Sequence, residues 1–166
     1  MGPISCSRLL VACLNPRLVP NVLLRASGFF YRHRIDSMAK FFTMLNVLFF
    51  GIEVSPRVEI EGGLFLPHTV GTVIGAERIG CNATIMQGVT LGTKEPDMEF
   101  TAAMRPVVGD HVTIGAGAKI IGRVKLGDHA KIGANAVVLH DVPPHAVMAG
   151  IEARIMELPQ QESQDE

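Results

Sequence analysis

The stretch "VGDHVTIGAGAKIIGRVKLGDHAKIGANAVV", residues 108–138, has an aliphatic residue at every sixth position. These positions are Val108, Ile114, Ile120, Leu126, Ile132 and Val138. Four positions after each of the first five comes a small or β-branched residue: Val112, Ala118, Val124, Ala130 and Ala136. Upstream, the same rhythm runs through Val54, Ile60 and Leu66, and then through Val73, Ile79, Ile85 and Leu91.

A period of six fits neither an amphipathic helix, whose apolar positions are three and four apart, nor a lone strand, whose apolar positions alternate. Three six-residue units, each a short strand and a corner, make one turn of a triangular solenoid whose aliphatic residues all point inward. We therefore predict a mainly β fold, a parallel β-helix of about five coils over residues 54–92 and 106–142. We assign the glycines that follow inward positions to corners with unusual backbone angles: Gly80, Gly92, Gly109, Gly115, Gly127 and Gly133.

Length and composition indicate one domain with a real core and a short appendage, since 48% of the 166 residues are hydrophobic. We divide the chain into a helical segment at 1–50, a β-helix at 51–155 with a protruding loop at 93–104, and a polar tail at 156–166. The three cysteines, Cys6, Cys13 and Cys81, have no paired spacing. They argue against a disulfide framework or structural zinc and favour a reducing cytoplasm.

The charge is distributed unevenly along the chain. Residues 1–50 hold six Lys/Arg and one acid, whereas the rest holds nine and fifteen. An acidic main domain with one tyrosine and no tryptophan argues against a nucleic-acid partner. Arginines interrupt the apolar runs of the first segment before they reach membrane-spanning length. We expect two or three short helices there, broken near Pro16 and Pro20, which either cap the solenoid or rest on the inner face of a membrane.

Six motifs follow one another in a recognisable order: "PHTVGTVIG" (67–75), "MQGVTLG" (86–92), "TIGAGAKIIG" (113–122), "KIGANAVVL" (131–139), "VPPHAV" (142–147) and "AGIEARI" (149–155). Over residues 53–155 the chain resembles the serine acetyltransferase family of hexapeptide-repeat acyltransferases. The resemblance implies a left-handed β-helix, an exception to the right-handed crossover rule. It also implies a homotrimer that binds acyl-CoA between neighbouring subunits.

His68 lies where the six-residue rhythm slips by one, between Leu66 and Val73. An extra residue at a corner would turn this side chain out toward a groove; the alternative is a surface histidine at a corner that tolerates an insertion. Acetyl transfer to a hydroxyl needs a base, and an imidazole, with an unperturbed pKa of about 6.5, suits that task. The resemblance implies that His68 is this base and that Glu53, fifteen residues earlier, orients it. On an eighteen-residue coil this spacing can bring the two onto adjacent coils.

The remaining histidines lack comparable context, and we read them as surface or turn residues: His33, His111, His129, His140 and His145. No metal site is predicted. The resemblance implies acetyl-CoA as co-substrate, with Gly92, Ala116 and Ala134 against its pantetheine arm, and with Arg154 and Lys119 or Lys131 near its phosphates. The alternative is that corners require small residues and that scattered basic side chains are simply solvated.

The expected acceptor site departs from the family pattern at two positions. Pro67 stands where the family has the aspartate that binds the amino group of serine, and Arg105, in "AMRPVV", replaces a second histidine. Loss of the carboxylate would cost an ammonium roughly 1.5–3 kcal/mol. We therefore expect a cytoplasmic O-acetyltransferase acting on a saccharide hydroxyl, with Arg105 and Pro67 at the acceptor. A short basic first segment also resembles acetyltransferases found among polysaccharide-building enzymes. Serine O-acetylation and a non-catalytic β-helix scaffold are the alternatives.

Overall fold

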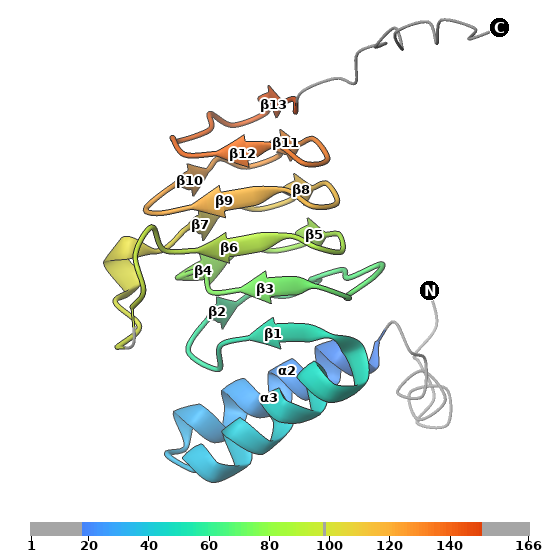
Figure 1. The fold of residues 1–166 in the computed structure, drawn as a ribbon, viewed down its shortest axis with the longest axis vertical. Coiled ribbons are helices and arrows are strands. Elements are labelled where there is room, and N and C mark those ends of the chain that lie inside the picture. The colour runs from blue at the N-terminus through green and yellow to red at the C-terminus, as the bar shows by residue number, and fades with distance from the viewer. Residues whose placement is uncertain (1–17, 98, 151–166) are drawn as a thin grey trace, which may run out of the picture.

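The computed structural model describes residues 18–97 and 99–150, in which two helices precede a β-helix (Figure 1). Helix α2 (Val19–Arg32) and helix α3 (Asp36–Phe50) lie side by side at one end of the stack. Pro20 lies in the first turn of α2 and does not break a helix, because at that position its missing N–H removes no hydrogen bond. Helix α3 ends at Gly51, whose left-handed φ of 61° favours glycine. Pro16 and the tail at 156–166 lie outside the described residues.

In the described part of the chain, thirteen short strands form three parallel faces. The first face contains β1 (Ile52–Val54), β3 (Thr72–Ile74), β6 (Thr90–Gly92), β9 (Lys119–Ile121) and β12 (Val137–Val138). The second contains β2 (Glu59–Ile60), β4 (Arg78–Ile79), β7 (Val107–Val108) and β10 (Lys125–Leu126). The third contains β5 (Thr84–Ile85), β8 (Thr113–Ile114), β11 (Lys131–Ile132) and β13 (Val147–Met148). Figure 1 shows the chain winding upward in left-handed turns through these faces.

The core is the predicted stack of aliphatic side chains. All six inward residues of the stretch 108–138 are at most 2% exposed, and their five small or β-branched companions are also buried. The period of six therefore predicted the inward positions of this stretch correctly. Each coil places its inward residues on those of the coil below, so that one continuous core runs along the molecule.

The predicted inward position of Val73 is wrong. Val73 is 36% exposed, whereas Thr72 and Ile74 on either side of it are 1% exposed. The inward residues are Leu66 and Ile74, eight positions apart, followed by Ile79, only five positions further. The corner at 67–71 thus holds two extra residues and the next corner holds one fewer, which together look like a slip of one.

The predicted reason for the six corner glycines is also wrong, because none of them has a positive φ. What they provide is space between coils: a Cβ added at Gly80 would lie 2.7 Å from the backbone of Gly109, and one at Gly127 would lie 2.4 Å from the nitrogen of Pro144. Gly92 is an exception, since an added Cβ there would meet only a methyl group, 3.9 Å away. Left-handed angles belong to two other columns of corner residues: Gly63, Asn82, His111, His129 and His145 in one, and Gly71, Gly88, Gly117 and Asn135 in the other.

A long excursion leaves the β-helix between β6 and β7 without disturbing the ladder. Ile79 pairs with Val108, 29 positions later, and Val108 pairs with Leu126, 18 positions later. The extra residues form the protruding loop, seen in yellow in Figure 1, and include a short 3-10 helix, η1 (Ala102–Met104).

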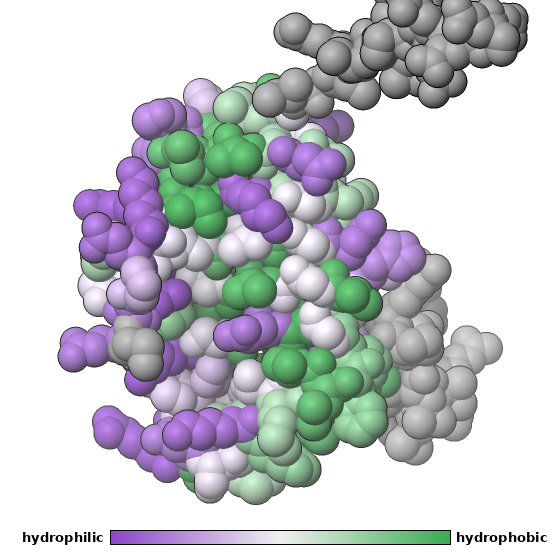
Figure 2. Space-filling view, viewed as in Figure 1, coloured by the Kyte–Doolittle hydropathy of each residue, from purple (hydrophilic) through white to green (hydrophobic). Residues whose placement is uncertain are grey.

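The helices close the first coil, as the capping interpretation expects. Leu24 of α2 joins the core of the β-helix, and α3 leads directly into β1. The outward face of α3 exposes Phe41, Met44, Leu48 and Phe49, and hydrophobic side chains gather over the helical end in Figure 2. Among the described residues, no helix combines the length and apolar character needed to span a membrane. Contact of residues 1–50 with a membrane surface stays a prediction.

Candidate active site

The widest corner of the β-helix, residues 67–71, carries His68. Its backbone is tied to the end of α3. The hydroxyl of Thr69 donates to the carbonyl oxygen of Phe50 at 2.7 Å, and the amide of Gly71 donates to the carbonyl one residue beyond Phe50 at 2.9 Å. This fixed corner holds the imidazole of His68 in an exposed position.

A cavity of about 490 Å³ adjoins His68. Among the described residues its lining carries no carboxylate, lysine or arginine: apolar side chains surround the imidazole and the Thr69 hydroxyl. Pro67, predicted to contact the acceptor, lines this same cavity next to His68. The described residues that line it are Phe49, Phe50, Leu66, Pro67, His68, Thr69 and Val70.

Glu53 lies in the middle of β1, and its side chain points outward. In the parallel ladder the residue is paired with Val73 of β3. Its carboxylate lines a second cavity, of about 310 Å³, together with Gly92 and residues of the protruding loop. Within the described part of the chain no hydrogen bond joins Glu53 to His68, and the two side chains line different cavities. Their pairing as base and orienting carboxylate therefore stays a prediction.

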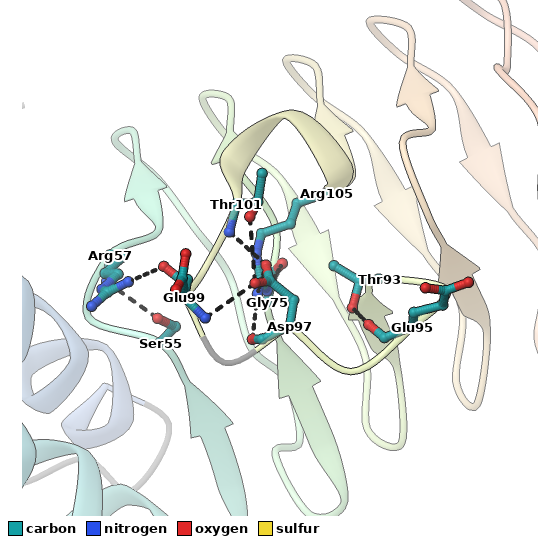
Figure 3. Close-up of polar contacts among 9 residues, drawn as sticks. All are labelled: Ser55, Arg57, Gly75, Thr93, Glu95, Asp97, Glu99, Thr101 and Arg105. Atoms are coloured by element: carbon teal, nitrogen blue, oxygen red, sulfur yellow. Dashed lines mark hydrogen bonds and ion pairs between the residues drawn. The ribbon is translucent and has the colours of Figure 1, made fainter.

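Arg105 anchors the loop that roofs the Glu53 cavity. Its guanidinium forms a salt bridge with Asp97 at 2.9 Å, donates to the carbonyl oxygen of Gly75 at 3.0 Å, and stacks 3.8 Å from the ring centre of Phe100. Figure 3 shows the contacts of Arg105 with Asp97 and Gly75 beneath η1. The residue is only 8% exposed, and its Nε is buried without a hydrogen-bond partner among the described atoms. The contact of Arg105 with substrate stays a prediction. The partners that its guanidinium has in the structure are Asp97, Gly75 and Phe100 of the same chain.

Asp97 is the counterpart of that anchor. Burial raises the pKa of Asp97, but hydrogen bonds from the backbone amide of Thr101 and from the guanidinium of Arg105 outweigh it. The pKa of Asp97 therefore lies below its ordinary range. The amide of Glu99 also donates to Asp97, at 3.1 Å, so one carboxylate organises the turn of the loop.

The residues predicted to meet the co-substrate lie at different places. Gly92 ends β6 and lines the Glu53 cavity, whereas Ala116 and Ala134 occupy successive corners after the third face. The amide of the residue after Ala134 donates to the carbonyl oxygen of Ala116, so the two corners stack. The ammonium of Lys119 donates to the carbonyl oxygen of Gly88 at 2.6 Å. Arg154 lies outside the described residues.

Sequence reasoning missed two features. Asp97 and Phe100 hold Arg105 in place, although the aperiodic loop gives no spacing rule that would pair them. The imidazoles of His111, His129 and His145 form a column with ring centres 4.8 and 4.9 Å apart and nearly parallel planes. The interval between His111 and His129, equal to one coil, could have revealed it. These residues are turn residues, as predicted. Residues 18–97 and 99–150 contain no cluster of histidine, cysteine and carboxylate side chains suited to a metal ion.

Comparisons with known proteins agree with the geometry. Residues 105–140 match the family model for the bacterial transferase hexapeptide (six repeats). A serine acetyltransferase of Staphylococcus epidermidis is 40% identical over 127 residues, which cover 76% of this chain and 58% of that protein. The chain spans about three-fifths of the length of the curated relatives that it matches.

Solved structures give the same result for the fold. A serine acetyltransferase in complex with CoA superposes with a TM-score of 0.70 at 35% identity, covering 82% of this chain and 55% of that one. The serine acetyltransferase of Neisseria gonorrhoeae, in complex with serine, superposes with a TM-score of 0.74 at 31% identity, covering 92% and 62%. Residues 52–148 therefore form a left-handed hexapeptide-repeat β-helix that is similar to those of the serine acetyltransferases.

Proposed function

We propose that this protein transfers the acetyl group of acetyl-CoA to the hydroxyl of L-serine, with His68 as general base. The position of His68 carries the proposal: it lies at the widest corner, exposed beside a cavity in which it is the one titratable side chain among the described lining residues. Its imidazole takes the hydroxyl proton as the oxygen attacks the thioester carbonyl. The carbon–sulfur bond then breaks, and the sulfur of CoA leaves with a proton returned from the imidazolium.

Serine replaces the saccharide that Pro67 and Arg105 led us to expect. Arg105 is held by Asp97 and Phe100, so its presence in the sequence no longer argues against an ammonium at the acceptor site. The relatives compared above are named for serine, which supports the same choice. A saccharide hydroxyl is the second candidate, because Pro67 leaves the His68 cavity without the carboxylate expected to bind an amino group.

Glu53 and Gly92 have supporting roles in this proposal. A carboxylate that reaches the second ring nitrogen would fix the tautomer of His68 and stabilise its charged form. Gly92 lines the Glu53 cavity, and the fold does not require a glycine at this position. The missing side chain therefore leaves room for the pantetheine arm of acetyl-CoA. Ala116, Ala134 and Arg154 are assigned to the same co-substrate by resemblance.

Release of CoA thiol from acetyl-CoA, measured with and without L-serine, tests the proposal. His68→Ala should lower serine-dependent release by roughly 10²–10⁴-fold, the usual contribution of a general base. His140→Ala is the matched control, since this exposed histidine lies in the last coil and lines neither cavity. A folded wild-type protein that binds acetyl-CoA but releases no thiol with serine would exclude serine as the acceptor.

A further inference from the structure

A third cavity, of about 350 Å³, lies where the tip of the helical pair meets the β-helix. Arg32 ends α2, Arg34 lies in the turn before α3, and Arg57 lies at the first corner after β1. Tyr31 and Asp36 complete the lining. None of these residues lines the cavities of His68 or Glu53.

Positive charge exceeds negative charge around this cavity. In the described ranges the salt bridges are Arg78–Glu61 and Arg105–Asp97, so the three arginines of the cavity have no carboxylate within 4.0 Å. Asp36 is the one acid in the lining, set against three guanidinium groups.

A fourth arginine lies close to this group. Arg25 donates to the carbonyl oxygens of Ile60 and Glu61, so its hydrogen bonds are directed into the β-helix. Burial lowers the pKa of Arg25, and the charge of Arg32 lowers it further. That effect is expected where cations crowd together.

Arg57 is held in place by groups that leave its charge available. It donates to the carbonyl oxygen of Glu99 in the protruding loop, as Figure 3 shows. Its guanidinium carbon lies 5.7 Å from the ring centre of Tyr31 and 5.8 Å from that of Phe100. Aromatic faces attract a guanidinium without neutralising it, so an arriving anion would meet an ordered cation with free donors.

Arg34 adopts a backbone conformation that arginine does not favour. Its φ is 62°, in the left-handed region, which is unfavourable for a residue with a Cβ. Glycine or asparagine would fill this turn position more easily. The conformation closes the end of α2, because the amide of Ile35 donates to the carbonyl oxygen of Phe30, and it leaves Arg34 in the lining of the cavity.

We propose that this cavity binds a phosphate-bearing ligand, a phosphomonoester or diphosphate, through Arg32, Arg34 and Arg57. Planar guanidinium groups match phosphate oxygens in pairs and form charge-assisted hydrogen bonds that are stronger than neutral ones. The cavity is larger than one phosphate and accommodates part of the group that carries it. The site does not depend on acetyl transfer, because it shares no residue with the His68 cavity.

Titration calorimetry with inorganic pyrophosphate at physiological ionic strength tests this site on the full chain. Wild-type protein should bind, and Arg57→Gln should weaken binding tenfold or more. Arg34→Gly should weaken it likewise while the thermal midpoint stays equal or rises, because glycine relieves the left-handed conformation. Arg123→Gln is the charge-matched control, since this exposed arginine lines other cavities, and it should bind like wild type.

A second arm identifies the source of the phosphate. Co-sedimentation with phosphatidylcholine vesicles that contain phosphatidic acid, lost in Arg34→Gly but kept in Arg123→Gln, would assign a lipid headgroup. Pyrophosphate binding without such co-sedimentation would assign a soluble ligand. Absence of binding to both probes would overturn the site, as would an equal loss in Arg123→Gln, which would reveal nonspecific charge attraction.

Discussion

At the scale of single residues, Pro67 is the main difference from the family pattern in the His68 cavity. It is half-buried beside the imidazole and offers neither a charge nor a hydrogen-bond donor to the acceptor. A bound amino group must therefore find its partners elsewhere in a lining that is otherwise largely apolar.

Replacing this proline gives a direct prediction about the acceptor. Pro67→Asp should lower the KM for L-serine by about tenfold or more, because a charge-assisted hydrogen bond contributes roughly 1.5–3 kcal/mol. Steady-state kinetics at saturating acetyl-CoA would measure the change, with Pro67→Asn as the uncharged control. An unchanged KM in a folded Pro67→Asp protein would mean that no ammonium lies near this residue.

Two glycines separate the demands of folding from those of the ligand. Gly92→Ala should leave the free energy of unfolding nearly unchanged and raise the KM for acetyl-CoA, because the added methyl group points into open space beside Glu53. Gly80→Ala should destabilise the fold by about 1–3 kcal/mol, because its methyl group would collide with the backbone of Gly109. Denaturant unfolding and acetyl-CoA kinetics on both variants would measure these effects. The reverse pattern would refute the assignment of Gly92 to the co-substrate.

At the scale of elements, the loop between β6 and β7 depends on one ion pair, Asp97 with Arg105. The pKa of Asp97 is lower in the folded protein than in an unfolded chain. The carboxylate therefore stabilises the folded state fully above the ordinary aspartate pKa of about 3.9. This contribution is lost as the pH falls from there through the folded pKa.

Removing the charge of Asp97 should loosen the loop in a pH-dependent way. At pH 7, Asp97→Asn should speed amide hydrogen exchange in residues 93–104 and lower the unfolding midpoint. As the pH is lowered toward the folded pKa of Asp97, the difference in unfolding midpoint between Asp97→Asn and wild type should become smaller. Glu95→Gln is the matched control, because it removes a charge from the same loop while only the backbone oxygen of Glu95 accepts a hydrogen bond. If the two substitutions had equal effects, the loosening would come from the loss of any negative charge in the loop and not from the Asp97–Arg105 ion pair.

The repeat stretch 108–138 and the corner at His68 differ in how far the sequence predicts them. The stretch 108–138 repeats one spacing, so each inward residue supports the assignment of the next, and all were correct. At the His68 corner the predicted inward position of Val73 was wrong. Two added residues and one later deletion shift the pattern by the same total as one insertion. The burial of Arg105 could not be predicted, since Asp97 and Phe100 approach it through a loop without periodicity. The candidate base was found because a break in a regular pattern marks its position.

At the scale of the whole molecule, apolar side chains remain exposed along the β-helix. Val70 and Val137 are 73% and 64% exposed, and Leu139 is also exposed. Cyclic association of identical subunits buries such surfaces symmetrically. The homotrimer implied by the resemblance would do so.

Light scattering coupled to size exclusion tests the assembly. We expect a particle of three times the chain mass of 17.9 kDa, held over a wide range of protein concentration. The exposed valines provide the reason, because a monomer would leave them in water. A mass equal to one chain at all concentrations would contradict the trimer and, with it, any site formed between subunits.

The ladder that joins Ile79 to Val108 passes beneath the protruding loop as if the loop were absent. The scaffold therefore treats residues 93–104 as a cassette. A library with randomised length and composition at this one place can be displayed on an unaltered β-helix, provided that Arg105 keeps an acidic partner. Selection from such a library would change which ligands enter the Glu53 cavity beneath the loop, while the β-helix that carries His68 stays the same.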